Sequence, residues 1–235
     1  MFLRCIVLCF LLFTVCACEK KQHNVSNQKI FTQIYQKSLW GKNSHGEGCS
    51  GDGSSLVNAT PYMNFLQTFM QEHDIKSVVD VGCGDWEFSK HMDWTGITYI
   101  GIDVVPTVVK KNNALYKNKK CSFICKDVTK KSLPKGDLLI CKDVLQHLTT
   151  QDIKAVCRQF QKFKYCLITN DIDNTSSVVK LNDDLPVLGG LRELDLTLEP
   201  FNITAEKVFS YTVPTGPDGC ITSTKQVLLI TRSLP

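Results

Sequence analysis

Short apolar segments alternate with amphipathic ones from Ile75 almost to the end of this chain, and this alternation constrains the fold most strongly. The apolar segments have the length and β-branched content of buried strands, and the segments between them have helical spacing. Strands are expected at residues 77–83, 97–103, 121–128, 137–143 and 165–172, with helices at 86–92, 104–116 and 151–163. Strands that alternate with helices form a parallel sheet covered on both faces, so we predict an α/β fold.

The regions on either side of this alternation predict further elements. Two strands are expected at residues 208–214 and 226–232, as an antiparallel hairpin. A helix is expected at 30–40, followed by a Gly- and Ser-rich loop at 41–55 that is either a lid or an ordinary linker. Thr60 and Pro61 are typical of an N-cap and a first helical residue, so the next helix is expected to begin at Pro61.

The N-terminus has the pattern of an export signal. A short positive start is followed by an apolar run from Cys5 to Ala17, which is shorter than the roughly 20 residues of a membrane span. We therefore predict a signal peptide or lipoprotein-type leader at 1–18, with possible lipidation of Cys18, a tether at 19–29 and a single domain at 30–235. An exported or membrane-anchored protein is expected, or a cytosol-facing one if the leader is an uncleaved anchor.

Composition narrows the possible partners and the redox compartment. The net charge of +4 is small and forms no basic stripe, so no nucleic-acid partner is inferred. Four of the 12 cysteines lie in the leader, and Cys83, Cys141 and Cys166 lie in apolar runs where a thiol behaves as a small hydrophobe. Cysteine usage therefore favours a reduced interior, which conflicts with the leader. The oligomeric state stays open.

The turn after the first strand, VGCGDWEF, predicts the class of ligand. Gly82 and Gly84 let a ligand approach the backbone closely, but Glu87 stands where a dinucleotide site has its third glycine. Asp80 and Asp85 make the turn acidic, which suits the positively charged S-adenosylmethionine better than a pyrophosphate. A nicotinamide-dependent oxidoreductase is therefore disfavoured.

Aspartates at the next two strand ends support the same cofactor. Asp103 closes the second strand, 19 residues after Gly84, where a carboxylate can accept both hydroxyls of a ribose. Asp127, followed by Val128, closes the third strand, where a carboxylate can accept from an adenine amino group. The alternative for each aspartate is a turn or cap without ligand contact.

The segments VVDVGCGDW, YIGIDVV, CKDV and DLLICKDVLQHL together resemble the successive motifs of class I S-adenosylmethionine-dependent methyltransferases. The resemblance covers about residues 77–171. It implies a Rossmann-like, seven-stranded, mostly parallel sheet with an antiparallel last strand and helices on both faces. It also implies a set of cofactor-binding residues: Asp80, Gly82, Cys83 and Gly84 near the methionine part, Asp103 and Val104 at the ribose, Asp127 and Val128 at the adenine, and Lys142.

Candidates for acting on the methyl acceptor lie at the ends of strands four and five. Asp143, His147 and Asp171 are predicted as catalytic residues, because ligands of open α/β sheets bind at the carboxyl ends of the strands. Asp143, Asn170 and Asp171 also resemble the magnesium site of catechol-type O-methyltransferases, although strand-end residues that only shape a pocket are an alternative. For His147 the alternative is a helix residue packed on the sheet. In LQHL, Gln146 replaces the acid usual in the family, which weakens any catalytic role there.

Between strands five and six, residues 188–203 are expected to shape the substrate site. Arg192 is expected to pair with an acidic acceptor or with Glu193, Asp195 or Glu199. The function predicted is methyl transfer to an unidentified small-molecule acceptor. The alternative is an exported, non-catalytic binding protein that keeps the fold.

Overall fold

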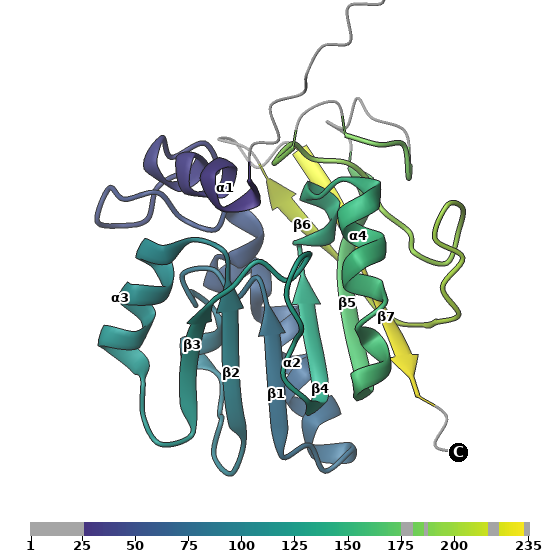
Figure 1. The fold of residues 1–235 in the computed structure, drawn as a ribbon, viewed down its shortest axis with the longest axis horizontal. Coiled ribbons are helices and arrows are strands. Elements are labelled where there is room, and N and C mark those ends of the chain that lie inside the picture. Colours follow the sequence, from purple (N-terminus) through teal and green to yellow (C-terminus); the bar gives the residue numbers. More distant parts are fainter. Residues whose placement is uncertain (1–25, 175–180, 186–187, 216–220, 233–235) are drawn as a thin grey trace, which may run out of the picture.

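The computed structural model describes residues 26–174, 181–185, 188–215 and 221–232, and its centre is a seven-stranded sheet in the order β3-β2-β1-β4-β5-β7-β6 (Figure 1). Strands β1 to β5 run parallel, and β7 is antiparallel to both β5 and β6. The strands are β1 (Ser77–Val81), β2 (Thr98–Asp103), β3 (Cys121–Cys125), β4 (Gly136–Lys142), β5 (Phe163–Asn174), β6 (Glu206–Thr215) and β7 (Ile221–Thr231). The predicted sheet, with its antiparallel last strand, is confirmed.

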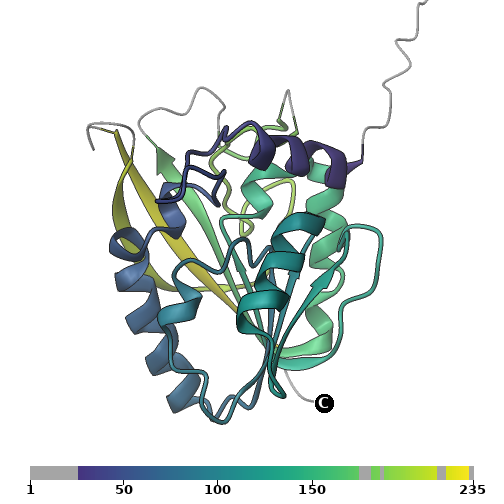
Figure 2. The same cartoon turned by 90° about the vertical axis from the view of Figure 1, so that its left-hand side faces the viewer.

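Helices cover both faces of the sheet. The α-helices are α1 (Asn27–Gln36), α2 (Leu56–Glu72), α3 (Pro106–Tyr116) and α4 (Thr150–Cys157), and the 3-10 turns are η1 (Asp52–Ser54), η2 (Ser89–His91), η3 (Leu145–His147) and η4 (Phe160–Lys162). Helix α2 covers one face and α4 the other, while α1 lies beyond the carboxyl ends of the central strands (Figures 1 and 2). This position makes α1 a roof over the edge where ligands bind in such sheets.

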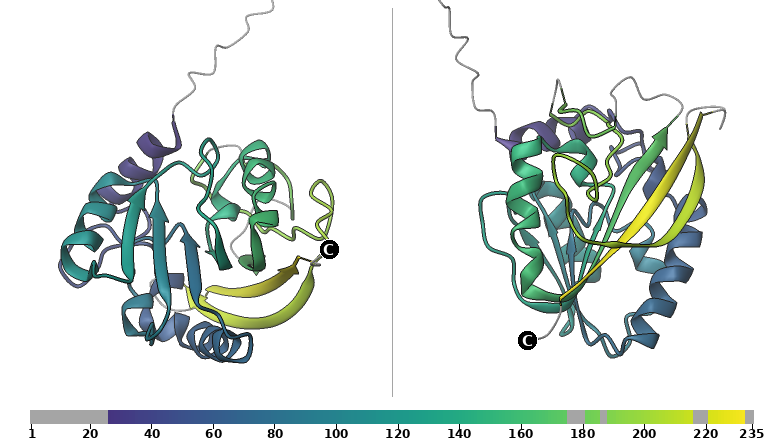
Figure 3. Two further views of the ribbon diagram at one scale, coloured as in Figure 1. Left: turned by 60° about the horizontal axis from the view of Figure 1, so that its bottom comes forward. Right: turned by 90° about the vertical axis from the view of Figure 1, so that its right-hand side faces the viewer.

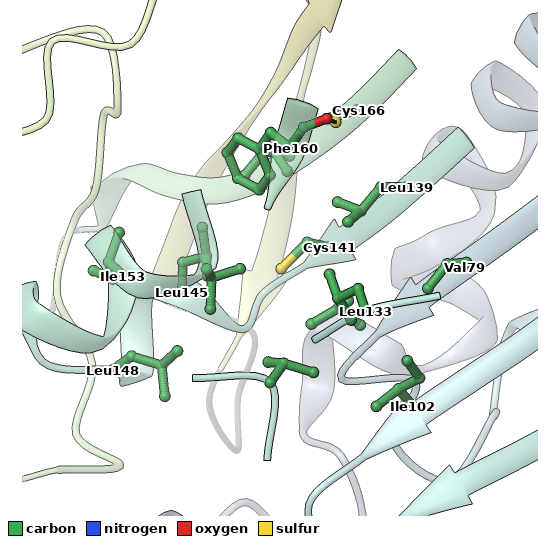
Figure 4. Packing of buried hydrophobic residues seen from close by; sticks show 14 of the residues in the cluster. Val79, Ile102, Leu133, Leu139, Cys141, Leu145, Leu148, Ile153, Phe160 and Cys166 are labelled. Carbon is green, nitrogen blue, oxygen red and sulfur yellow. Dashed lines mark hydrogen bonds between the residues drawn. The ribbon is translucent and has the colours of Figure 1, made fainter. Parts of the chain in front are cut away.

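Two hydrophobic clusters hold these layers together. On the α4 face, Leu139 and Cys141 of β4 pack with Leu145, Ile153 and Phe160 (Figure 4). On the other face, residues of α2, among them Tyr62, Leu66 and Phe69, pack on β1, β4 and β6. The hairpin of β6 and β7 forms the sheet edge opposite β3 (Figure 3). Successive side chains along the strands point alternately into the two clusters, as expected for a sheet that is buried on both sides.

Helix α2 begins earlier than the sequence predicted. Its N-cap is Ser55, whose side chain accepts a hydrogen bond from the Asn58 amide, and Pro61 lies inside the helix instead of at its start. Pro61 removes one helical hydrogen bond, which would have gone to the carbonyl of Val57. Val57 is 82% exposed, so water can solvate that carbonyl. The Ser55 cap and this exposure explain why Pro61 does not mark the boundary.

Three other expectations differ in extent. The predicted helix at 86–92 is a turn that contains only η2, and the helix predicted to reach residue 163 ends at Cys157. Strand β5 continues to Asn174, because its outer half pairs with β7 beyond the end of β4. Asn170 and Asp171, expected at the end of this strand, are therefore inside its outer half.

Helix α1 begins at Asn27, within the predicted tether. The predicted leader, 1–18, and the tether up to residue 25 lie outside the described residues. Within the part of the chain that is described, no helix is long and apolar enough to cross a membrane. The seven cysteines described there are all free thiols.

Candidate active site

The turn after β1 is held in a conformation that glycine adopts readily. Gly82 and Gly84 have φ angles of 73° and 54°, and the Gly82 amide donates to the carbonyl of Ile102 at 2.7 Å. A Cβ on Gly82 would lie 2.3 Å from Cγ2 of Val144. The turn is thus pressed between β2 and the residues that follow β4, so only glycine fits at position 82.

Asp103 fixes the second glycine of this turn by a hydrogen bond. Its carboxylate accepts hydrogen bonds from the backbone amides of Gly84 at 3.1 Å and Val105 at 2.9 Å. Burial raises the pKa of Asp103 to about 6, although these amide bonds favour the charged form. A carboxylate that is ionised at pH 7 but incompletely compensated is a strong acceptor for ligand hydroxyls.

Asp80 lies beneath the turn and does not line the pocket. Its carboxylate accepts from the Tyr99 hydroxyl at 2.6 Å, and burial raises its pKa to about 6. The side chain therefore acts on the turn from below, through charge rather than through direct contact with the space above it.

A pocket opens above the turn, at the carboxyl ends of β1 to β4. Of the predicted site residues, ten line it: Gly82, Cys83, Gly84, Asp103, Val104, Asp127, Val128, Lys142, Asp143 and His147. Its roof comes from segments that the motifs do not include: Asn27, Phe31 and Tyr35 of α1, then Trp40, Ser50 and Ser54. The predicted loop at 41–55 therefore covers the pocket as a lid would.

The residues around the turn suit S-adenosylmethionine in shape and charge. The Asp127 carboxylate is fixed at the pocket by Thr129, whose hydroxyl and amide donate to it at 2.7 and 3.1 Å. Val104 and Val128 line the same pocket and can give apolar walls for a flat ring, and Asp103, which bonds the turn at Gly84, lines it with them. Asp85 and Glu87 also line the pocket and disfavour a pyrophosphate, whereas they complement a sulfonium and an amino group. The pocket-lining residues around the turn thus fit the predicted cofactor, S-adenosylmethionine.

One hydroxyl fastens the lid to the turn. Ser50 Oγ donates to the carboxylate of Asp85 at 2.6 Å, accepts from the Asp85 amide at 3.0 Å and lies 2.7 Å from the Tyr35 hydroxyl. A Cβ on Gly84 would lie only 2.2 Å from this Oγ. The second glycine of the turn is therefore needed to receive the lid.

A buried charge network lies beside the turn, under the lid. Asp143 accepts from Lys142 at 2.5 Å and from Lys225 at 3.0 Å, and Lys225 also pairs with Asp171 at 2.8 Å. Burial opposes ionisation of Asp143, but the two ammonium groups outweigh it and hold its pKa well below the usual range. Lys142 also donates to the carbonyl of Gly53 at 2.9 Å, so the network supports the lid from below.

Asp171 belongs to this network and does not line the pocket. Besides Lys225, it receives hydrogen bonds from Ser223 and from the side chain of Gln146, at 2.9 Å for the latter. Because lysines occupy Asp143 and Asp171, these carboxylates are not arranged to hold a magnesium ion. No group of three or more potential metal-ligating side chains occurs among the described residues. The structure thus gives the resemblance to the magnesium site no support.

His147 lies at the end of η3 and lines the pocket. Its Nδ1 is 2.6 Å from the carbonyl oxygen of Gly190, and its ring packs on Trp40 with 4.8 Å between centroids. Burial lowers the pKa of His147, so the imidazole is neutral at pH 7. A neutral imidazole whose Nδ1 donates to a carbonyl presents Nε2 as a proton acceptor.

Arg192 does not form the predicted ion pair with Glu193, Asp195 or Glu199. Its side chain is fully buried, and the carboxylate that it contacts is Asp184, at 3.4 Å. Sequence motifs did not indicate a role for Tyr35, Trp40, Gly53 or Lys225 individually, because these residues lie far from the motifs along the chain. The Gly- and Ser-rich composition of the lid was the one signal that pointed to any of them.

Comparison with known proteins shows what part of the chain is similar to. Residues 79–163 match the family described as a methyltransferase domain. Magnesium protoporphyrin IX methyltransferase from Synechocystis PCC 6803, with bound S-adenosylhomocysteine, is similar in structure, with a TM-score of 0.58 at 14% identity over 88% of this chain and 100% of that one. The N-methyltransferase NodS from Bradyrhizobium japonicum, also with bound S-adenosylhomocysteine, gives 0.57 at 12% identity over 87% of this chain and 98% of that one.

At these identities the structural matches establish the fold alone. A third, a protein studied for the conversion of a disulfide bond into a thioacetal group during echinomycin biosynthesis, gives a TM-score of 0.59 at 14% identity over 87% of this chain and 91% of that one. No curated protein matches the chain in sequence.

Proposed function

We propose that this chain, which has the class I methyltransferase fold, uses S-adenosylmethionine to methylate a small molecule whose exchangeable proton is removed by His147. We call the Gly82–Gly84 turn with Asp103 and Asp127 the donor side. We call His147 with Asp143, Lys142 and Lys225 the acceptor side. The observation that carries the proposal is the neutral, oriented imidazole of His147 at the pocket wall.

The cofactor supplies the electrophilic methyl group, and the residues of this chain supply position and a base. Methyl transfer is an in-line displacement, so the acceptor atom must approach the methyl group along one direction and lose its proton. Nε2 of His147 has no hydrogen-bond partner among the described residues, which leaves its lone pair free for that proton. When it takes the proton, the Nδ1–H bond to Gly190 helps to stabilise the imidazolium.

The roof of the pocket supports a small acceptor. Aromatic side chains enclose the space, with Tyr35 and Trp40 above the turn and Phe88 beside Lys142. The lid is bonded to both sides of the pocket, through Ser50 on the donor side and Gly53 on the acceptor side. A protein or nucleic-acid acceptor would have to displace this roof, whereas a small molecule can be enclosed by it.

Methyl-labelled S-adenosylmethionine and a library of small phenols, amines and thiols provide the test. The full chain should label one class, and His147→Asn should lower that turnover by about 100-fold or more while S-adenosylmethionine affinity is unchanged. Asparagine keeps a donor for the Gly190 carbonyl but is not a base. His91→Asn, at an exposed histidine outside the pocket, is the matched control. Wild-type turnover in His147→Asn would exclude the proposed base.

A further inference from the structure

Residues 189–192 contact His147 and Leu148 through three hydrogen bonds, each of which includes at least one backbone group. The Gly189 amide donates to the carbonyl of His147 at 3.0 Å, the Gly190 carbonyl lies 2.6 Å from Nδ1 of His147, and Arg192 donates to the carbonyl of Leu148 at 2.8 Å. We propose that Arg192 is a positioning residue, which holds the Gly189–Gly190 turn on His147 and thereby fixes the imidazole tautomer that accepts a proton. This inference rests on the proposed role of His147.

Arg192 acts as a clamp, because its buried side chain hydrogen-bonds to several separate segments of the chain. Its guanidinium donates to the carbonyls of Leu148 and Asp183, the second at 2.6 Å, and it also reaches the Thr150 hydroxyl at 3.3 Å. These hydrogen bonds replace the hydration that Nη1 and Nη2 of the buried guanidinium lose, while Nε has no partner among the described residues. Here these bonds tie the segment before Arg192 to Leu148 and to the first residue of α4, Thr150, which directly follow His147 in the chain.

The turn that Arg192 holds favours glycine at position 189. Gly189 has a φ angle of 85°, and a Cβ there would lie 2.5 Å from Cδ1 of Ile34 in α1. The turn is therefore fixed between the roof helix and η3. Both the missing side chain at Gly189 and the clamp at Arg192 are needed to bring the Gly190 carbonyl to Nδ1.

The chemical consequence is a single tautomer. A backbone carbonyl only accepts hydrogen bonds, so Nδ1 of a neutral His147 must carry the proton and Nε2 must be unprotonated. If the turn moves away, nothing selects this tautomer. Part of the population would then carry its proton on Nε2, where it cannot take one from an acceptor. Arg192 thus acts on the reaction through Gly190 and His147, without touching a substrate.

The test is nitrogen-15 NMR of the imidazole in the full chain at a pH where it is neutral, with His147→Asn assigning its signals. This readout needs no acceptor. In the wild type, the Nδ1–H tautomer should be in about tenfold excess, the ratio expected for one buried hydrogen bond. In Arg192→Met this excess should be lost, and Arg192→Lys, which can still donate to a carbonyl, should restore part of it.

Gly189→Ala removes the excess by a second route if Arg192→Met does not fold. Two matched controls should leave the tautomer unchanged. Arg232→Met removes an exposed arginine that bonds the carbonyl of Gln161, and Gly96→Ala introduces a side chain at a similar positive φ with open space around it. A folded Arg192→Met or Gly189→Ala that keeps the wild-type tautomer would overturn the inference. If the tautomer changes while methyl transfer stays at the wild-type rate, the positioning role stands and the proposed base is wrong.

Discussion

The donor side and the acceptor side lie next to each other in one pocket but are built in different ways. The donor side comes from residues 82–127, and its geometry is fixed by bonds between Asp103 and backbone amides of neighbouring strand ends. The acceptor side combines residues 142–147 with Lys225, is bonded to the distant Gly53 and Gly190, and is held together by buried charges.

This difference separates the part of the pocket that can bind the same cofactor in many proteins from the part that depends on the individual side chains of this one. A turn fixed by backbone bonds can bind the same donor in many proteins, because few side chains are involved. A charge network depends on each of its members, since removing one leaves another buried without a partner. We therefore expect substitutions on the acceptor side to reduce stability, and those on the donor side to reduce donor affinity.

The largest expected effect is that of Asp143→Asn on stability. The change leaves Lys142 and Lys225 buried with one carboxylate between them, and should lower the free energy of unfolding by about 3 kcal/mol, as measured by urea denaturation. Asparagine also tolerates the positive φ of 57° at this position, so the charge alone is tested. Because the pKa of Asp143 is lowered, its contribution should be present above pH ~4 and disappear as the pH falls below that value.

Asp74→Asn is the matched control for this prediction. Asp74 also has a positive φ, of 51°, and pairs with Lys76, but that pair is exposed to solvent. Its replacement should change stability far less. Equal losses in the two variants would mean that the buried network does not stabilise the acceptor side.

On the donor side, Asp103→Ala should weaken S-adenosylmethionine binding by about 100-fold, as measured by calorimetry. It removes the ribose acceptor together with the bonds to Gly84 and Val105, and each charged hydrogen bond contributes about 1.5–3 kcal/mol. Asp137 is a comparable aspartate near the amino end of β4, at the opposite end of the strands from the pocket, where it accepts from the amides of Lys76 and Ser77. Asp137→Ala should leave the affinity unchanged, and a similar loss in both variants would contradict a local role for Asp103.

Donor affinity should also depend on pH in a defined direction. The pKa of Asp103 is raised to about 6, so the carboxylate becomes protonated as the pH falls below that value and accepts ligand hydroxyls less well. Affinity should be constant above pH ~7 and decrease by up to about tenfold per pH unit below 6. Titrations from pH 5 to 8 check this, and Asp103→Asn should remove the dependence. If Asp80→Asn removes it instead, the titrating group is Asp80, which has a similar pKa.

The smallest expected effect is that of releasing the lid from the donor side. Ser50→Ala removes the hydroxyl that bonds Asp85 and Tyr35, and should reduce donor affinity by about fivefold, a loss of about 1 kcal/mol. Ser54→Ala is the matched control, because its hydroxyl bonds only the carbonyl of Gly51 within the lid. Hydrogen exchange of residues 41–55 should increase in Ser50→Ala and stay unchanged in the control. The reverse pattern would show that Ser50 does not fasten the lid.

The donor side could be predicted from the sequence because its signals are local along the chain. Glycines after one strand and aspartates at the ends of the next two lie in register once the strands are parallel, so one pattern predicts both fold and cofactor. Asp80 is the exception, since only the structure shows its carboxylate turned to Tyr99 and away from the pocket.

The acceptor side could not be predicted in the same way. Lys225 pairs with Asp143 because β7 inserts between β5 and β6, and nothing near either residue signals that pairing. The role of Asp171 depends on β5 continuing past β4, which places its carboxylate opposite Lys225 and not in the pocket. Likewise, the tautomer of His147 depends on a carbonyl 43 residues away.

The most direct test of the donor site is a calorimetric titration of the full chain with S-adenosylmethionine and then with S-adenosylhomocysteine, with NAD as the control. We predict that both sulfur compounds bind at one site per chain and that NAD does not, because Asp85 and Glu87 oppose its pyrophosphate. Binding of NAD, or the absence of binding of both sulfur compounds to a folded chain, would contradict the assignment of the Gly82–Gly84 turn and Asp103 to the methyl donor.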